Sequence, residues 1–133
     1  MKVSSKYESP LVLEKIEITE STFRKKDVLL EGLELNVHVE HNVENIGEDG
    51  YEITLNTIVS DENENIYVSV KGKAVFRTQQ NNMDILEKNT IAIMFPYIRS
   101  YISIITTQPG MAPIVLPAMN IIAMINDQKT MKL

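Results

Sequence analysis

The chain contains no cysteine, and only 5 of its 133 residues are glycine. Without cysteine, disulfide bonds, thiolate nucleophiles and cysteine-based metal sites are excluded. No glycine-rich phosphate loop, nucleophile elbow of the form G-x-S-x-G or H-E-x-x-H metal motif occurs either. The common sequence signatures of catalysis are therefore missing, and we expect no enzymatic activity and no cofactor.

Positive charge is absent from a long central part of the chain. Residues 27–70 hold eleven acidic side chains and no lysine or arginine, whereas residues 91–133 hold one acid and three bases. Two interpretations stay open: the acids solvate a sheet edge and its loops, or they form a negative surface for a basic partner. Nucleic acid is disfavoured in either case, because phosphates require a positive surface.

Charge of either sign is nearly missing from residues 91–125, where Arg99 is the only charged side chain. An acidic chain with so long an apolar stretch must bury it in an assembly or use it for binding. Ile91–Thr107 has the length of a helix, but it is short for a membrane span and carries Arg99 near its middle. No apolar run of a signal peptide follows the first lysines. We therefore expect a cytosolic protein with an oligomerisation and binding surface in this stretch.

Proline and glycine divide the apolar stretch into three parts. Gln108–Gly110 ends the first helix, and Ala112–Pro117 is too proline-rich for anything but an extended crossing segment. A second, shorter helix begins within Asn120–Ile125. Upstream of the apolar stretch, Gln79–Lys88 is polar and predicts a linker, with room for one helical turn near Met83–Leu86.

Four strand-like segments precede these helices. Apolar and polar residues alternate along them with a period of two, which is typical of a sheet with one dry and one wetter face. A short polar link at 61–65 predicts a hairpin between the last two segments, and the longer link at 42–50 also fits an antiparallel return. The expected strands are Leu11–Phe23, Leu33–His41, Tyr51–Ser60 and Ile66–Arg77.

The order of the segments, strands first and helices last, predicts a single α+β domain over residues 1–133. The sheet would be antiparallel, with the helices on one side of it. A chain of this length can build one hydrophobic core without disulfides or metals. The ends, residues 1–10 and 127–133, are expected to be flexible.

The two histidines are the side chains that most suggest a metal site. His38 and Glu40 would lie on the same face of a strand and could begin a zinc site, while His41 points the other way. No third histidine exists to complete the usual ligand set. We therefore expect an exposed polar strand face at this position and no metal.

Methionine is concentrated in the apolar stretch, which holds four of the seven, at positions 94, 111, 119 and 124. This flexible, polarizable side chain fills gaps in ordinary cores, and it also suits a soft surface that accommodates many different apolar chains. Core packing is the alternative for any single methionine.

The segment M-F-P-Y-I-R at 94–99 resembles the L-F-P-Y-A-R segment that opens the long helix of SecB, the family of bacterial protein-export chaperones. The proline crossover at 113–117 follows at a matching distance, and M-N-I at 119–121 resembles the V-N-F that starts the family's last helix. Upstream, Ile16–Phe23 resembles the family's first strand, and Y-E-I-T-L at 51–55 resembles the Y-E-V-x-L of its third. The resemblance covers roughly residues 14–125.

This resemblance implies a SecB-like four-stranded antiparallel sheet, a long helix, a proline-rich crossover and a short last helix, assembled as a tetramer that is a dimer of dimers. It also implies an ATP-independent holdase that binds unfolded polypeptides in apolar grooves and serves protein export. Apolar burial is non-directional, so many weak contacts hold an extended client whatever its sequence. The implied client-binding residues are Leu35, Val37, Val39, Met94, Phe95, Tyr97, Met111, Ile114 and Leu116. For each of them, packing in the core or at a subunit interface is the alternative.

The chain departs from the family at positions used for docking on the export motor SecA. Glu20 keeps one of the family's acidic docking positions, but Arg24 and Ser69 replace acids at two others. These departures weaken the expectation of docking on SecA. SecB-like proteins also serve as dedicated chaperones of one client, such as an antitoxin, and a structural oligomer without a client groove is a further alternative. Arg99 is expected to pair with an acid or with backbone carbonyls at the helix interface.

Overall fold

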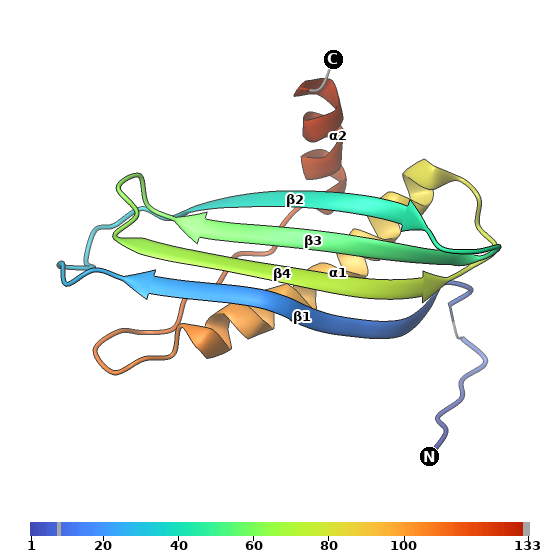
Figure 1. Cartoon of the computed structure of the whole chain (residues 1–133), viewed down its shortest axis with the longest axis horizontal. Coiled ribbons are helices and arrows are strands. Elements are labelled where there is room, and N and C mark those ends of the chain that lie inside the picture. Colours follow the sequence, from blue (N-terminus) through green and yellow to red (C-terminus); the bar gives the residue numbers. More distant parts are fainter. Residues whose placement is uncertain (8, 132–133) are drawn as a thin grey trace.

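The computed structural model describes residues 1–7 and 9–131. Four strands form one antiparallel sheet in the order β1-β4-β3-β2, and two helices follow it in the chain (Figure 1). The elements are β1 (Val12–Lys25), β2 (Asn36–Asn45), β3 (Gly50–Ser60), β4 (Ile66–Arg77), α1 (Met83–Ile105) and α2 (Ile121–Met131). The predicted α+β class, with the sheet first and the helices last, is confirmed.

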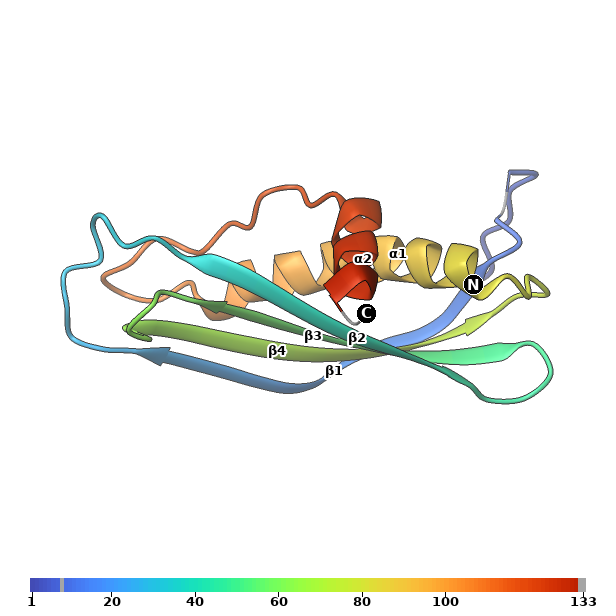
Figure 2. The same ribbon diagram turned by 90° about the horizontal axis from the view of Figure 1, so that it is seen from above.

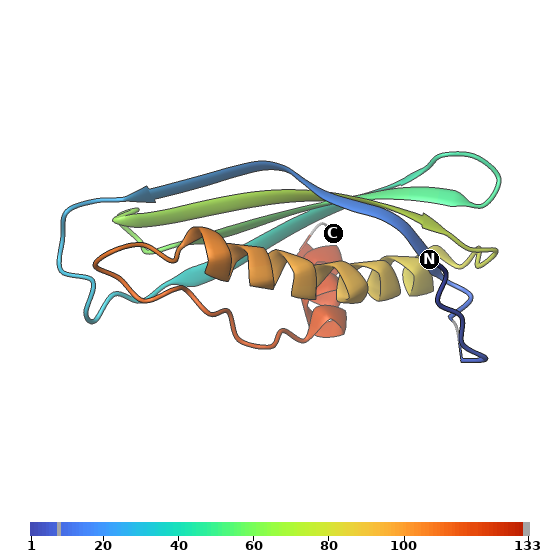
Figure 3. The same ribbon diagram turned by 90° about the horizontal axis from the view of Figure 1, so that it is seen from below.

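Both helices lie on the same side of the sheet (Figures 2 and 3). The two central strands, β3 and β4, bury every second side chain on that side, which is the reason for their alternating sequence. The buried apolar residues of these strands are Tyr51, Ile53, Leu55, Val59, Ile66, Val68, Val70, Ala74 and Phe76. Polar side chains dominate the other, outer face of the sheet.

Helix α1 begins at Met83, eight residues earlier than Ile91. The predicted linker Gln79–Lys88 therefore ends at Asn82, and the single helical turn expected near Met83–Leu86 is the start of the long helix. The side chain of Asn82 caps the helix by accepting hydrogen bonds from the backbone N–H groups of Asp84 and Ile85, at 3.1 and 3.3 Å. One buried residue, Leu86, is enough to continue the apolar face of the helix through this polar segment. The helix also continues through Pro96, which lies on its exposed side.

The second strand is displaced by three or four residues from the predicted Leu33–His41. Residues 42–45, predicted to be part of a long loop, extend β2 and pair with β3, with Val43 opposite Ile53. The hairpin loop is therefore residues 46–49, where Gly47 adopts a φ of +124°. Residues 127–131, part of an end expected to be flexible, are helical as the last turns of α2; flexibility of the ends stays a prediction.

Helix α2 is tied to the sheet edge and to the start of α1 by polar side chains. The Gln128 side chain donates a hydrogen bond to the backbone carbonyl of Val39 at 2.6 Å. Lys129 lies 2.7 Å from Asp84 and 3.7 Å from Glu87. The Lys129 ammonium, followed by Lys88, lowers the pKa of the Asp84 carboxyl. These contacts place α2 over the β2 edge, where Val39 is buried.

Gly72, near the middle of β4, lets α1 approach the sheet closely. A Cβ added at this position would lie 2.6 Å from the Cδ1 atom of Ile98, which is fully buried. The absence of a side chain at Gly72 therefore fixes how deeply α1 lies on the sheet.

Replacing Gly72 by alanine should destabilise the fold by about 1–3 kcal/mol, because the new methyl group collides with Ile98. Ile98→Val removes the colliding atom and alone should cost about 0.5–1.5 kcal/mol. The double variant should then lose less than the sum of the two single losses. Free energies of unfolding in denaturant measure all three; strict additivity would mean that Ile98 does not meet the new methyl group.

Candidate functional site

An apolar groove opens at one end of the molecule, between the link from β1 to β2 (residues 26–35, the connector) and the segment from α1 to α2 (residues 106–120, the crossover). Figures 2 and 3 show the connector and the crossover side by side at this end. We call this hollow of about 320 Å³ the crossover groove. It is lined by Leu30, Glu31, Leu33, Leu35, Ile66, Met111, Ala112 and Ile114. Three of the nine predicted client-binding residues, Leu35, Met111 and Ile114, thus meet in one site.

Two glycine turns shape the walls of the crossover groove. Gly32 has a φ of +84°, and the backbone N–H of Leu33 bonds the carbonyl of Leu30 at 3.2 Å across this turn. In the crossover, Gly110 has a φ of +85°. Leu30 and Leu33 were not predicted as site residues from the sequence. The signal that could have found them is a leucine on either side of a glycine, because a turn at that glycine brings both leucines to one wall of the groove.

The floor of the groove is held by the β3–β4 hairpin. The Asp61 carboxylate accepts hydrogen bonds from the backbone N–H of Ile66 and from the Asn65 side chain, both at 2.8 Å. The Ile66 N–H is the main reason that the pKa of Asp61 is lowered. Asp61 therefore stays ionised at neutral pH and keeps Ile66 in place.

Most of the other predicted residues lie beneath the surface of the single chain. Val37 is half-buried and packs against the core. The residues buried in the core are Val39, Met94, Phe95 and Leu116. Core packing is the alternative that the sequence left open for them, and client contact by these residues stays a prediction.

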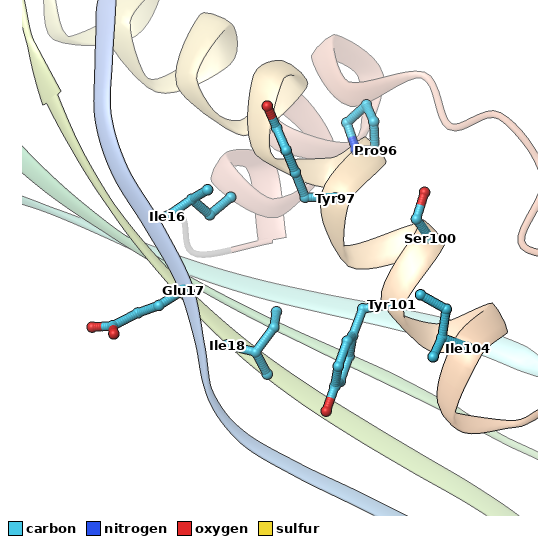
Figure 4. Close-up of a pocket in the computed structure, with 8 residues that line it drawn as sticks. All are labelled: Ile16, Glu17, Ile18, Pro96, Tyr97, Ser100, Tyr101 and Ile104. Atoms are coloured by element: carbon cyan, nitrogen blue, oxygen red, sulfur yellow. The ribbon is translucent and has the colours of Figure 1, made fainter. Parts of the chain in front are cut away.

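Tyr97 lies in a second apolar hollow, between the edge strand β1 and the outer side of α1 (Figure 4). We call this hollow of about 430 Å³ the edge cleft; its lining residues are Ile16, Glu17, Ile18, Pro96, Tyr97, Ser100, Tyr101 and Ile104. Tyr97 is 52% exposed and Ile104 is 68% exposed. The Tyr101 hydroxyl lies 3.1 Å from the Ser21 hydroxyl and fixes that ring against β1.

The outer face of the sheet carries the three positions compared with SecA docking. Glu20 is exposed and lies opposite Lys71 in the register of β1 and β4. Arg24 stacks over the Tyr67 ring, 4.5 Å from its centroid, and Ser69 donates to Asn56 at 3.4 Å. This face therefore presents both signs of charge rather than an acidic surface.

The two histidines and Glu40, which were considered for a metal site, lie on two different faces of the sheet, as their spacing along the strand predicts. His38 and Glu40 lie 3.0 Å apart on the outer face, whereas His41 faces the helices and lies 2.6 Å from Glu87. Among the described residues, no group of three or more histidine, aspartate or glutamate side chains could hold a metal ion. The half-buried side chain of Arg99 makes no hydrogen bond or ion pair with the described residues, so its pairing with an acid or with backbone carbonyls at the helix interface stays a prediction. In the part of the chain that the structure describes, neither helix is long and apolar enough to cross a membrane.

The family model described as preprotein translocase subunit SecB matches residues 3–132. The chain belongs to the SecB family. This confirms the resemblance read from the sequence, and membership supports a chaperone role. A SecB-like chaperone of Mycobacterium tuberculosis, Rv1957, solved in complex with a ChAD peptide from the HigA1 antitoxin, has a similar fold, with a TM-score of 0.67 at 12% identity over 83% of this chain and 88% of that chain.

Two further proteins are similar to this member of the SecB family. The uncharacterized protein MJ0357 of Methanocaldococcus jannaschii is 28% identical over 134 residues, which cover 93% of this chain and 84% of that protein. A solved protein of unknown function from Streptococcus agalactiae has a TM-score of 0.50 at 13% identity, over 81% of this chain and 97% of its own. The similarity to the solved protein concerns the fold alone.

Proposed function

We propose that this SecB-family protein is an ATP-independent holdase that binds unfolded polypeptide segments in the crossover groove. The observation that carries the proposal is the meeting of Leu35, Met111 and Ile114 with the connector leucines around one open, apolar hollow. The groove is accessible in the single chain, and it offers no arrangement of polar groups that would select one small ligand.

The chemistry of the groove suits weak, unspecific capture of apolar side chains. Burial of one large apolar side chain contributes about 1.5–3 kcal/mol, which is too little for stable binding by itself. An extended client that reaches several such grooves of one assembly would gain affinity through effective concentration. Met111 and the leucines supply walls that adapt to different side chains.

Acidic residues beside the groove favour clients with basic flanks. Glu31 lines the groove, and Glu34, Glu62 and Glu64 are exposed on the connector and on the hairpin that precedes Ile66. Their position supports the second of the two interpretations of the charge pattern of residues 27–70, a negative surface for a basic partner. Clients with apolar segments next to lysine or arginine would therefore bind faster and tighter at low salt.

The experiment that tests the function is suppression of aggregation of a diluted, chemically unfolded reporter protein, without nucleotide. The wild-type protein should suppress aggregation, and Met111→Asp should weaken reporter binding by at least about tenfold, because a carboxylate is costly in an apolar wall next to Glu31.

Val115→Asp is the matched control for Met111→Asp, since it places the same charge on the same segment at a side chain that is 75% exposed. It should bind the reporter like the wild type. Equal loss in both variants would show that charge on the crossover, rather than the groove, governs binding. Failure of the wild type to suppress aggregation at several-fold excess would favour a single dedicated client or a structural oligomer.

The edge cleft is proposed to be covered by a second copy of the chain. β1 is an edge strand, and its outer backbone groups are free to pair with another strand within an assembly. Tyr97 and Ile104 beside it are more exposed than apolar side chains of this size usually are. We propose a cytoplasmic tetramer, built as a dimer of dimers, which is the assembly that the resemblance to the family implies.

Ile104→Asp should reduce the mass of the assembly in light scattering, because it places a charge in this proposed interface at a position where a single chain tolerates it. Ile122→Asp on α2 is the control, since Ile122 is similarly exposed at 57% but lies outside the edge cleft. An unchanged mass for Ile104→Asp would remove the edge cleft from the interface.

Two physiological roles are compatible with a holdase: service to one dedicated client, such as an antitoxin, and general protein export. The Mycobacterium chaperone bound to an antitoxin peptide favours a dedicated client of that kind, whereas export would require docking on SecA. Glu20 is exposed and available for such docking, but Arg24 and Ser69 provide no acidic surface around it. A dedicated client is therefore the stronger alternative to general export.

A further inference from the structure

Two hydroxyl side chains near the end of α1 hold a single residue of the crossover. The Ser103 hydroxyl donates to the backbone carbonyl of Ile114 at 2.8 Å. The backbone N–H of Ile114 donates to the Thr106 hydroxyl oxygen at 2.9 Å. Residues three apart lie on the same side of a helix, so the two hydroxyls bond both backbone groups of Ile114 much as a neighbouring strand would. We call this arrangement the Ile114 clamp.

Thr106 is fully buried, and its hydroxyl can act toward Ile114 only as a hydrogen-bond acceptor. The hydroxyl donates its hydrogen to the Ile102 carbonyl at 2.7 Å, so that its oxygen is free to accept from Ile114. The next hydroxyl, that of Thr107, donates to the Ser103 carbonyl at 2.7 Å and bonds nothing in the crossover.

The clamp is the one polar attachment of the central crossover. Between residues 112 and 118 of the described chain, Ile114 alone hydrogen-bonds to another part of the protein. The remaining side chains there are alanine, proline, valine and leucine, which have no donors. The two residues that follow the clamp differ in burial: Val115 is 75% exposed, while Leu116 is buried at 5% exposure.

We infer that Ser103 and Thr106 are positioning residues for the crossover groove. By fixing the backbone of Ile114, they hold one wall of the groove at a set distance from the connector leucines. Met111 lies in the glycine turn outside the clamp and remains the adaptable part of the same wall. A groove that is already formed binds a client more tightly than one that must be organised during binding. The effect on clients rests on the proposed function; the clamp itself does not.

The test compares three variants. Thr106→Val removes the hydroxyl acceptor with little change of shape, and Thr106→Ser keeps it. Thr107→Ala is the control, because its hydroxyl bonds only the Ser103 carbonyl of α1. Amide hydrogen exchange of Ile114 and affinity for a permanently unfolded, fluorescently labelled reporter protein are measured for each. Thr106→Val should exchange the Ile114 amide at least about tenfold faster and bind the reporter roughly tenfold more weakly. Thr106→Ser should restore both values, and Thr107→Ala should change neither.

Unchanged exchange of Ile114 in folded Thr106→Val would overturn the clamp. Faster exchange with unchanged reporter affinity would overturn its role in positioning the groove. If Thr106→Val does not fold, exchange of the Ile114 amide in the wild type decides, because without the clamp it would exchange as fast as the amide of Val115. Reporter affinity of Ser103→Ala, which removes the hydrogen bond to the Ile114 carbonyl at a half-buried side chain, then tests the role in positioning the groove. A wild-type protein that binds no reporter would contradict the proposed function, while the exchange of Ile114 would still decide whether the clamp exists.

Discussion

The packing of one helix against four strands governs the rest of the structure. A helix with its side chains is about 10–12 Å wide, whereas neighbouring strands lie about 4.8 Å apart, so a single helix covers roughly two strands. α1 approaches the sheet at Gly72 of β4 and lies over the two central strands, whose inward side chains are fully buried. The inner side of the edge strand β1 is left partly uncovered, and the edge cleft lies there. The crossover groove lies at one end of the sheet, between the connector, the start of β4 and the crossover.

The two hollows are completed by different parts of the molecule. On the β1 side nothing else in the described chain covers Ile16 and Ile18, and the edge cleft remains open next to the exposed Tyr97. On the β2 side, α2 lies over the buried Val39, and Leu116 anchors the crossover in the core, but the crossover leaves a groove against the connector. The surfaces that we propose for assembly and for client binding therefore lie at different parts of the molecule, the first between β1 and α1 and the second between the connector and the crossover.

The crossover combines a fixed part with an adaptable part. Hydrogen bonds of Ser103 and Thr106 fix the backbone of Ile114, and burial fixes Leu116. Met111 instead lies in a turn, and its side chain is unbranched. A fixed wall lowers the entropic cost of binding, and a methionine allows clients of different shape. In the proposed function, the acidic residues beside the groove add long-range attraction for clients with basic flanks.

The central strands were predictable because their period of two reports burial directly. β4 was predicted with its observed bounds, and β3 to within one residue. β2 was misplaced because Leu33 and Leu35 of the connector continue the alternation of Val37 and Val39, although Gly32 turns the chain there. The turn expected near Met83–Leu86 was not joined to the long helix, because one buried leucine in a polar segment gives no visible periodicity.

The site was predicted only in part, because it forms between segments that are far apart in the chain. Resemblance to the family supplied Leu35, Met111 and Ile114, which do meet in the groove. Leu30 and Leu33 could not be assigned, since their wall exists only after the connector has turned. The same resemblance supplied Met94 and Phe95, which α1 turns toward the sheet and into the core.

Methyl NMR of the assembled protein, titrated with an unfolded reporter polypeptide, tests most directly whether the crossover groove holds the client. The methyl resonances of Met111 and Ile114, on the groove wall, should shift or broaden, while that of Ile104 in the edge cleft should remain unchanged. Perturbation of Ile104 with no effect on Met111 and Ile114 would contradict the assignment of client binding to the crossover groove.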